Sequence, residues 1–150
     1  MRLRAGKGIR QGTALVEFAL GFAILVPLLA GALQYSIGFV QVQQLQSAVR
    51  TGAQYGSQLS YQSATDTPTD AFRRNVENMV LYGRPVETGQ PLVGGLRREH
   101  VAVAIGMESG VPRKLTVSIN GFEMALPTGR RVLEGSPSSS FPYRGHFDPR

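Results

Sequence analysis

Residues 18–33 read FALGFAILVPLLAGAL, and no charged side chain occurs from Phe18 to Val49. As a helix, this apolar run measures roughly 24 Å, which is shorter than the hydrocarbon core of a bilayer, whereas residues 13–33 measure about 31 Å. A membrane-spanning helix is therefore expected, with Glu17 near its edge. The alternative interpretation is a helix buried in the core of a soluble protein.

The positive charge of the chain is concentrated ahead of this run. The 150 residues include 16 Lys and Arg and 10 Asp and Glu, for a formal net charge of +6. The basic residues that precede the first acid, Glu17, are Arg2, Arg4, Lys7 and Arg10. Basic flanks are typical of the cytoplasmic side of a membrane helix, so we expect a cytoplasmic amino terminus, a translocated remainder and a lipid bilayer as a partner. The net charge therefore does not argue for nucleic acid as a partner.

Beyond the apolar run, glutamines alternate with apolar residues, and the pattern predicts one helix over residues 13–57 whose second half is amphipathic. Ala48, Gly52 and Gly56 recur every four positions and form a stripe of small residues on one face. The stripe indicates close approach of another backbone, or the glycines fray the helix end. Pro27 removes one helix hydrogen bond and predicts a kink or local unwinding.

The junction between the basic segment and the apolar run carries a carboxylate where a membrane makes it costly. Cleavage of the chain after Gly12 would create an ammonium at Thr13, four residues before Glu17, and residues i and i+4 share one helix face. The two charges could then neutralise each other within one chain. Alternatively, Glu17 could meet the Thr13 ammonium of a neighbouring subunit and set the register of a polymer.

At these residues the sequence resembles the type IV pilin superfamily, whose leader ends in Gly and whose mature segment has Glu at its fifth position. It is more similar to the TadE-like family of minor pilins and pilus-assembly proteins. The matching segments are Gly12, Glu17-Phe18-Ala19-Leu20, Val26-Pro27-Leu28 and the small-residue patch 48–56. Two positions depart from the family pattern: Phe18 stands where pilins of the Tad system often have Tyr, and Gln34 where TadE-like members often have an acid.

This resemblance implies cleavage after Gly12 by a prepilin peptidase, followed by assembly with other pilins and Tad pilus assembly proteins. Glu17, Phe18 and Pro27 are the assembly residues that it implies, in a protein that is not an enzyme. The implied location is the bacterial inner membrane, as a single-pass protein with a periplasmic head, or the pilus outside the cell. Three other interpretations stay open: a secretory signal with the small-residue site 30–32, an uncleaved envelope anchor or scaffold, and an exported enzyme.

The whole chain is predicted to have an α+β fold with a long amino-terminal transmembrane helix. We expect a basic leader over residues 1–12, the transmembrane and assembly helix over 13–57 and a polar linker over 58–68. A small α+β head should follow over residues 69–127. Residues 128–150 predict a flexible low-complexity tail, with disorder in the run SPSSS.

Within the head, a second helix is expected to start with Thr67 as its N-cap and to stop at Gly83. Two segments alternate apolar and other residues with the period of strands and predict a small antiparallel sheet. They are residues 101–105 and 115–119. Asn120-Gly121 then forms either a hairpin turn to a third strand over 122–126 or a bulge.

The sequence contains no recognisable motif for catalysis, a cofactor or a metal. There is no Cys, the two histidines, His100 and His146, have no ligand-spaced companions, and no serine lies in a Gly-x-Ser-x-Gly turn. Basic pairs recur through the head and could touch DNA or an acidic surface, although such pairs are more often solvated. They are Arg73-Arg74, Arg97-Arg98, Arg113-Lys114 and Arg130-Arg131.

Overall fold

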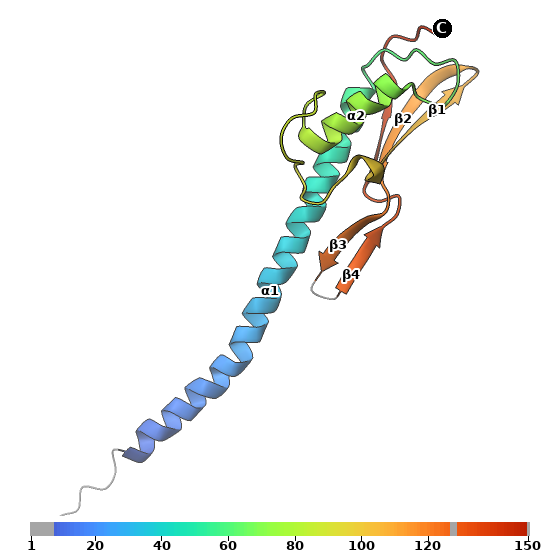
Figure 1. Ribbon diagram of the computed structural model, residues 1–150. Helices are drawn as coiled ribbons and strands as arrows, with labels where there is room; N and C mark the ends of the chain where they lie inside the picture. The colour runs from blue at the N-terminus through green and yellow to red at the C-terminus, as the bar shows by residue number, and fades with distance from the viewer. Residues whose placement is uncertain (1–7, 127–128, 150) are drawn as a thin grey trace, which may run out of the picture. The chain divides into compact units, whose positions relative to one another are not determined.

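The computed structural model describes residues 8–126 and 129–149. Its elements are, in order, α1 (Gly8–Gly56), α2 (Asp70–Tyr82), the short 3-10 helix η1 (Arg98–His100), β1 (Val101–Glu108), β2 (Val111–Ile119), β3 (Phe122–Leu126), β4 (Gly129–Leu133) and β5 (Ser138–Pro142) (Figure 1). The chain divides into two units, one ending at Ile37 and one starting at Gly38, and we call the second the head unit. A long apolar helix, a short helix and small antiparallel sheets confirm the predicted α+β class.

Helix α1 begins five residues earlier than the predicted helix and runs through Pro27 without a break in its helical assignment. The local unwinding that Pro27 predicted is therefore not seen. A proline removes one backbone hydrogen bond, and the alanines and leucines around it have high helix propensity. The bonds on either side are enough to keep the backbone helical.

Helix α2 begins two residues later than expected. Its N-cap is Thr69, whose Oγ1 accepts a hydrogen bond from the Phe72 N–H at 3.4 Å. Thr67 and Thr69 are both residues that can cap a helix, and the structure uses the second of them. The predicted stop is confirmed, because Gly83 has a φ of 67° and donates its N–H to the Met79 carbonyl.

The core of the head unit lies between the second half of α1, α2 and one face of a three-stranded antiparallel sheet. The strand order is β1-β2-β5, and Val101 pairs with Ile119 in the first ladder. Alternate residues of β2 face the core, and Leu115, Val117 and Ile119 are fully buried. They pack with Leu45 of α1, among others.

Residues 122–126 form a separate strand, β3, but it pairs with β4 in a second, two-stranded sheet. Asn120-Gly121 is therefore neither a β2–β3 hairpin turn nor a bulge; it carries the chain from one sheet to the other. The Asn120 N–H continues the ladder to the His100 carbonyl at 2.8 Å. Gly121 then turns the backbone with a φ of 68°, a value that glycine adopts without steric cost.

The carboxyl-terminal region differs from the predicted disordered tail. Residues 138–142 form β5, which pairs with β2 from Ser138 to Pro142. Thr116 and Ser140 share a hydroxyl hydrogen bond of 2.8 Å, and Phe141 packs against the core. Serines have little apolar surface to bury, so hydrogen bonds to β2 stabilise this strand in place of buried apolar area.

Candidate membrane and assembly helix

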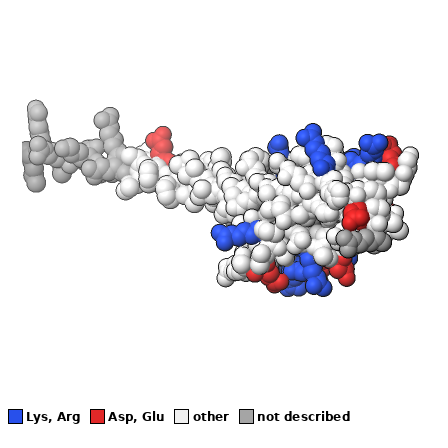
Figure 2. Space-filling model, turned by 90° about the horizontal axis from the view of Figure 1, so that it is seen from above, with Lys and Arg blue, Asp and Glu red and all other residues white. Residues whose placement is uncertain are grey.

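The first half of α1 exposes large apolar side chains on all sides. Leu15, Phe18 and Leu25 are 69%, 68% and 52% exposed, and the most apolar window of residues 12–56 has no buried part. Figure 2 shows this stretch as a surface largely free of charge. By length and composition, this helix could cross a membrane. An apolar surface of this size marks a site that contacts lipid or protein.

The predicted processing and assembly residues all lie within α1. Gly12 and Thr13 come after its first residues, and Glu17 is exposed four positions beyond Thr13. A Cβ atom at Gly12 would meet nothing within 4 Å, so the fold does not need a glycine there for space. Phe18 stacks on Phe22 one turn later, with 5.7 Å between ring centroids. Cleavage and charge pairing at these positions stay predictions.

In the second half of α1, the stripe of small residues faces elements of the same chain. Ala48 is 5% exposed. A Cβ atom at Gly52 would overlap the Val80 side chain of α2, and one at Gly56 would lie 2.6 Å from the Leu115 Cδ2 of β2. Real Cβ atoms do not come so close to other atoms. The glycines therefore let α2 and β2 approach the α1 backbone.

The predicted polar linker contains a fully buried tyrosine, Tyr61. The Tyr61 hydroxyl donates to the Thr65 carbonyl at 2.7 Å, and its ring meets the edge of Phe72 at 5.3 Å. Burial raises the pKa of this phenol. Its backbone binds the carboxyl-terminal segment: the Tyr61 N–H donates to the His146 carbonyl, and the Tyr61 carbonyl accepts from the Asp148 N–H. A lone tyrosine among polar residues is a weak signal, so the sequence did not reveal this contact.

Tyr143 strengthens the same contact from the carboxyl-terminal side. Its hydroxyl lies 2.6 Å from the Leu59 carbonyl and 2.9 Å from the His146 carbonyl. Burial is the main cause that raises the pKa of Tyr143. The segment after β5 is thereby fastened to the segment after α1.

A buried carboxylate, Glu77, holds α2 to the segment before β1. Its side chain is 6% exposed and lies 3.6 Å from the Nε of Arg73 and 3.6 Å from the Nε of Arg98. Burial raises the pKa of Glu77, and the guanidiniums of Arg98, Arg73 and, more weakly, Arg74 oppose that rise only in part. Arg98 also donates to Asn78 at 3.0 Å and to Glu87 at 3.1 Å. Arg73 is one helical turn from Glu77 in the sequence, whereas nothing local predicts Arg98.

No group of three or more His, Asp or Glu side chains is placed to hold a metal ion within residues 8–126 and 129–149. His100 instead accepts a hydrogen bond from the Arg97 N–H through its Nδ1, at 3.0 Å. Its ring meets the edge of Phe122 at 5.6 Å. These contacts are those of a histidine that packs the start of β1.

Comparison with known proteins finds a family match within the long helix α1. The family model described as TadE-like protein matches residues 12–54, which lie entirely within α1. No curated protein and no solved structure matches the chain. The matched residues run from Gly12 through Glu17 and Pro27 into the buried half of the helix, past Gly52. The resemblance in the sequence is thereby confirmed for one part of the chain: a TadE-like segment covers residues 12–54.

Proposed function

We propose that this protein is a structural subunit of a Tad-type pilus or of its assembly machinery, and that it is not an enzyme. The observation that carries the proposal is the coincidence of two features in α1. The TadE-like match covers the helix, and residues 12–37 of that helix are exposed apolar surface. A head unit with its own buried core leaves this segment available for lipid and for the helices of other subunits.

Before assembly, the bilayer of the bacterial inner membrane covers the apolar segment. The basic residues ahead of Glu17 keep the amino terminus in the cytoplasm, and the head unit is periplasmic. In the pilus, helices of other pilins and assembly proteins replace the lipid around the segment. Because both environments are apolar, transfer between them keeps the segment away from water.

A prepilin peptidase cleaves the chain after Gly12, and the new ammonium at Thr13 meets Glu17 of a neighbouring subunit. A carboxylate at the edge of the membrane has a cost that an opposite charge reduces. Pairing between subunits therefore stabilises one axial register over its neighbours. Phe18, which stacks on Phe22, and Pro27 lie on the same segment and contact neighbouring helices.

The first test is mass spectrometry of the native protein's amino terminus. We expect a mature chain that begins at Thr13. A chain that begins near Leu33 would show a secretory signal and contradict the proposal. An intact Met1 would contradict the processing step and leave the second candidate below.

The second candidate is an uncleaved single-pass anchor or scaffold of the cell envelope. Helix α1 is continuous from Gly8 across the bond between Gly12 and Thr13, an arrangement that suits an uncut helix. In that case Glu17 pairs with another membrane helix. Crosslinking from a photoreactive residue at position 18 separates the two candidates, because only the pilus subunit yields ladders of copies and other pilins.

The assembly charge is tested by Glu17→Gln, which removes the charge and keeps the shape. Cleavage should persist, and incorporation into filaments should fall by about tenfold or more, the effect of about 1.4 kcal/mol per subunit contact. Gln43→Ala is the control, since Gln43 is an exposed polar residue of α1 in the head unit. Incorporation of Glu17→Gln at the level of the control would contradict the pairing.

A further inference from the structure

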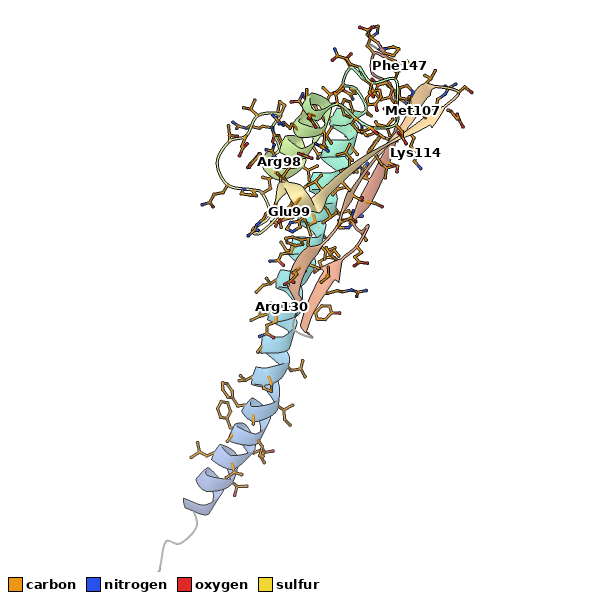
Figure 3. The ribbon with its side chains drawn as sticks, turned by 45° about the vertical axis from the view of Figure 1, so that its right-hand side comes forward. Arg98, Glu99, Met107, Lys114, Arg130 and Phe147 are labelled. Carbon is orange, nitrogen blue, oxygen red and sulfur yellow. The ribbon has the colours of Figure 1, made fainter. Side chains whose placement is uncertain are left out.

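An open hollow of about 800 Å³ lies between α2 and the first strand of the sheet. Four arginines line it, Arg73 and Arg74 from α2 and Arg97 and Arg98 from the segment before β1, together with two acids, Glu77 and Glu99. Residues 101–103 of β1 form the remaining side, where Val101 is nearly buried. Figure 3 shows Arg98 and Glu99 where β1 begins, beside α2. The hollow is thus a groove with a cationic rim and a strand along one side.

The strand in this groove is an edge strand. The sheet has the order β1-β2-β5, and β1 pairs only with β2 among the described residues. Asn120 donates to His100 across the ladder, and Val101 donates to Arg98 away from it. Because paired and unpaired residues alternate in an antiparallel ladder, the backbone N–H and C=O groups of Val103 and Ile105 also face away from β2. An extended segment could bind there as a fourth strand.

The four guanidiniums of the groove differ in how far their charge is already neutralised. Arg73 lies 2.7 Å from Asp70, and Arg98 lies 3.1 Å from Glu87, while Glu77 lies 3.6 Å from each of these arginines. The charges of Arg73 and Arg98 are thus already paired with carboxylates of the head unit.

The charge of the other two arginines is open to a partner. Among the described residues, Glu99 is the one acid within ion-pair distance of Arg97, at 3.5 Å, and both side chains are mostly exposed, so water screens that pair strongly. Exposed Arg74 has no carboxylate within ion-pair distance among the residues that the structure describes. Arg74 belongs to α2 and Arg97 to the segment before β1, and both line the groove. An acidic segment lying in it would meet both.

We propose that the groove binds an extended acidic segment of a protein partner, which adds to the free edge of β1 while its carboxylates pair with Arg74 and Arg97. The main-chain groups of Val103 and Ile105 provide binding that does not depend on sequence. The two guanidiniums provide the preference for acidic residues, because a planar fork of N–H donors fits a carboxylate. This site uses the head unit alone and does not depend on cleavage or on the membrane helix.

The test uses the full chain in detergent micelles and a soluble eight-residue peptide in which glutamates alternate with threonines. A matched peptide has glutamine in place of every glutamate. We expect the acidic peptide to shift amide resonances of residues 97–105 and to slow hydrogen exchange at Val103 and Ile105. The glutamine peptide should bind at least about fivefold more weakly, since one or two charge pairs at an exposed site are lost.

Variants separate the two parts of the site. Arg74→Gln and Arg97→Gln should each weaken binding by about threefold to fivefold, whereas Arg84→Gln, an exposed arginine outside the groove, should not. Val103→Pro removes the outward N–H, so exchange protection at Ile105 by the peptide should be lost. Retained protection of the β2 amides checks that this variant still folds.

Several outcomes would overturn the proposal. One is the absence of binding at millimolar peptide, and another is equal binding of the two peptides. A third is peptide binding that depends on Arg74 and Arg97 but does not slow hydrogen exchange at the Val103 and Ile105 amides. Tighter binding of a short DNA strand than of the acidic peptide would also overturn it, since a phosphate backbone cannot add to a sheet edge.

Discussion

The two halves of α1 have the same backbone and opposite surroundings. Leu33 is 68% exposed, whereas Leu45, about three turns later, is fully buried. Both halves are helical because most of their residues favour the helix, and this preference outweighs Pro27 and the scattered glycines. They differ in what covers them, since the head unit packs on the second half and nothing in the described chain covers the first. Helix formation in this protein is therefore a local property, and burial is not.

The same contrast appears in charge. Glu17 is the only Asp, Glu, Lys or Arg from residue 12 to residue 49, whereas the head unit has many charged side chains on its surface (Figure 2). Charges keep a unit soluble in water and are costly in a bilayer. The composition of the apolar segment and that of the head unit thus match the solvents that we propose for them.

The difference between the two halves of α1 should have its largest effect on stability when a leucine is replaced by alanine. Leu45→Ala should lower the free energy of unfolding of the head unit by about 2–5 kcal/mol, because it leaves a cavity in the core. Leu33→Ala should change it by less than about 0.5 kcal/mol. Denaturant unfolding of the full chain in detergent, followed by circular dichroism, measures both. Equal effects would show that the two halves do not differ as described.

Replacing a glycine of α1 by leucine should also destabilise the second half more than the first, by a smaller amount than the loss of Leu45. Gly52→Leu should destabilise the head unit by about 1–3 kcal/mol, because the new side chain overlaps Val80. Gly31→Leu is the matched control, since a Cβ atom there meets nothing within 4 Å. Thermal unfolding compares them. A stabilised Gly52→Leu would mean that α2 does not approach α1 so closely.

The contact between the chain end and the segment after α1 should respond to loss of one hydroxyl. Tyr143→Phe removes the hydrogen bond to the Leu59 carbonyl and should cost about 1 kcal/mol. Tyr35→Phe changes an exposed tyrosine of the apolar half and should cost nearly nothing. Hydrogen exchange at the Tyr61 amide should quicken only in Tyr143→Phe. Unchanged exchange there would contradict the role of Tyr143.

The smallest expected effect is a pH dependence from Glu77. Its folded pKa is raised above its ordinary value of 4.5 by burial, so the folded chain holds the proton more tightly than the unfolded chain. The free energy of unfolding should therefore fall as the pH rises from 4.5 through the raised folded pKa. Glu77→Gln should remove this slope, and Glu134→Gln, at an exposed acid, should keep it. A slope that survives in Glu77→Gln would assign it to other groups.

Hydropathy and charge along the chain were enough to predict the long helix and its membrane-spanning length, and short motifs from Gly12 onward carried the resemblance to the TadE-like family. Each of these depends on residues that are close in sequence, so a run such as residues 18–33 carries the whole signal. The stop of α2 at Gly83 was predictable for the same reason. The helix start was missed by two residues because both Thr67 and Thr69 can cap a helix.

The remaining features depend on partners distant in sequence. Residues 138–142 become a strand only because β2 offers an edge, and their composition resembles a disordered segment. Tyr61 is buried because the chain end folds back on it, and Glu77 is paired because Arg98 arrives from another element. Packing selects such pairs from many that the sequence would allow, and a local pattern contains no information about which partner arrives.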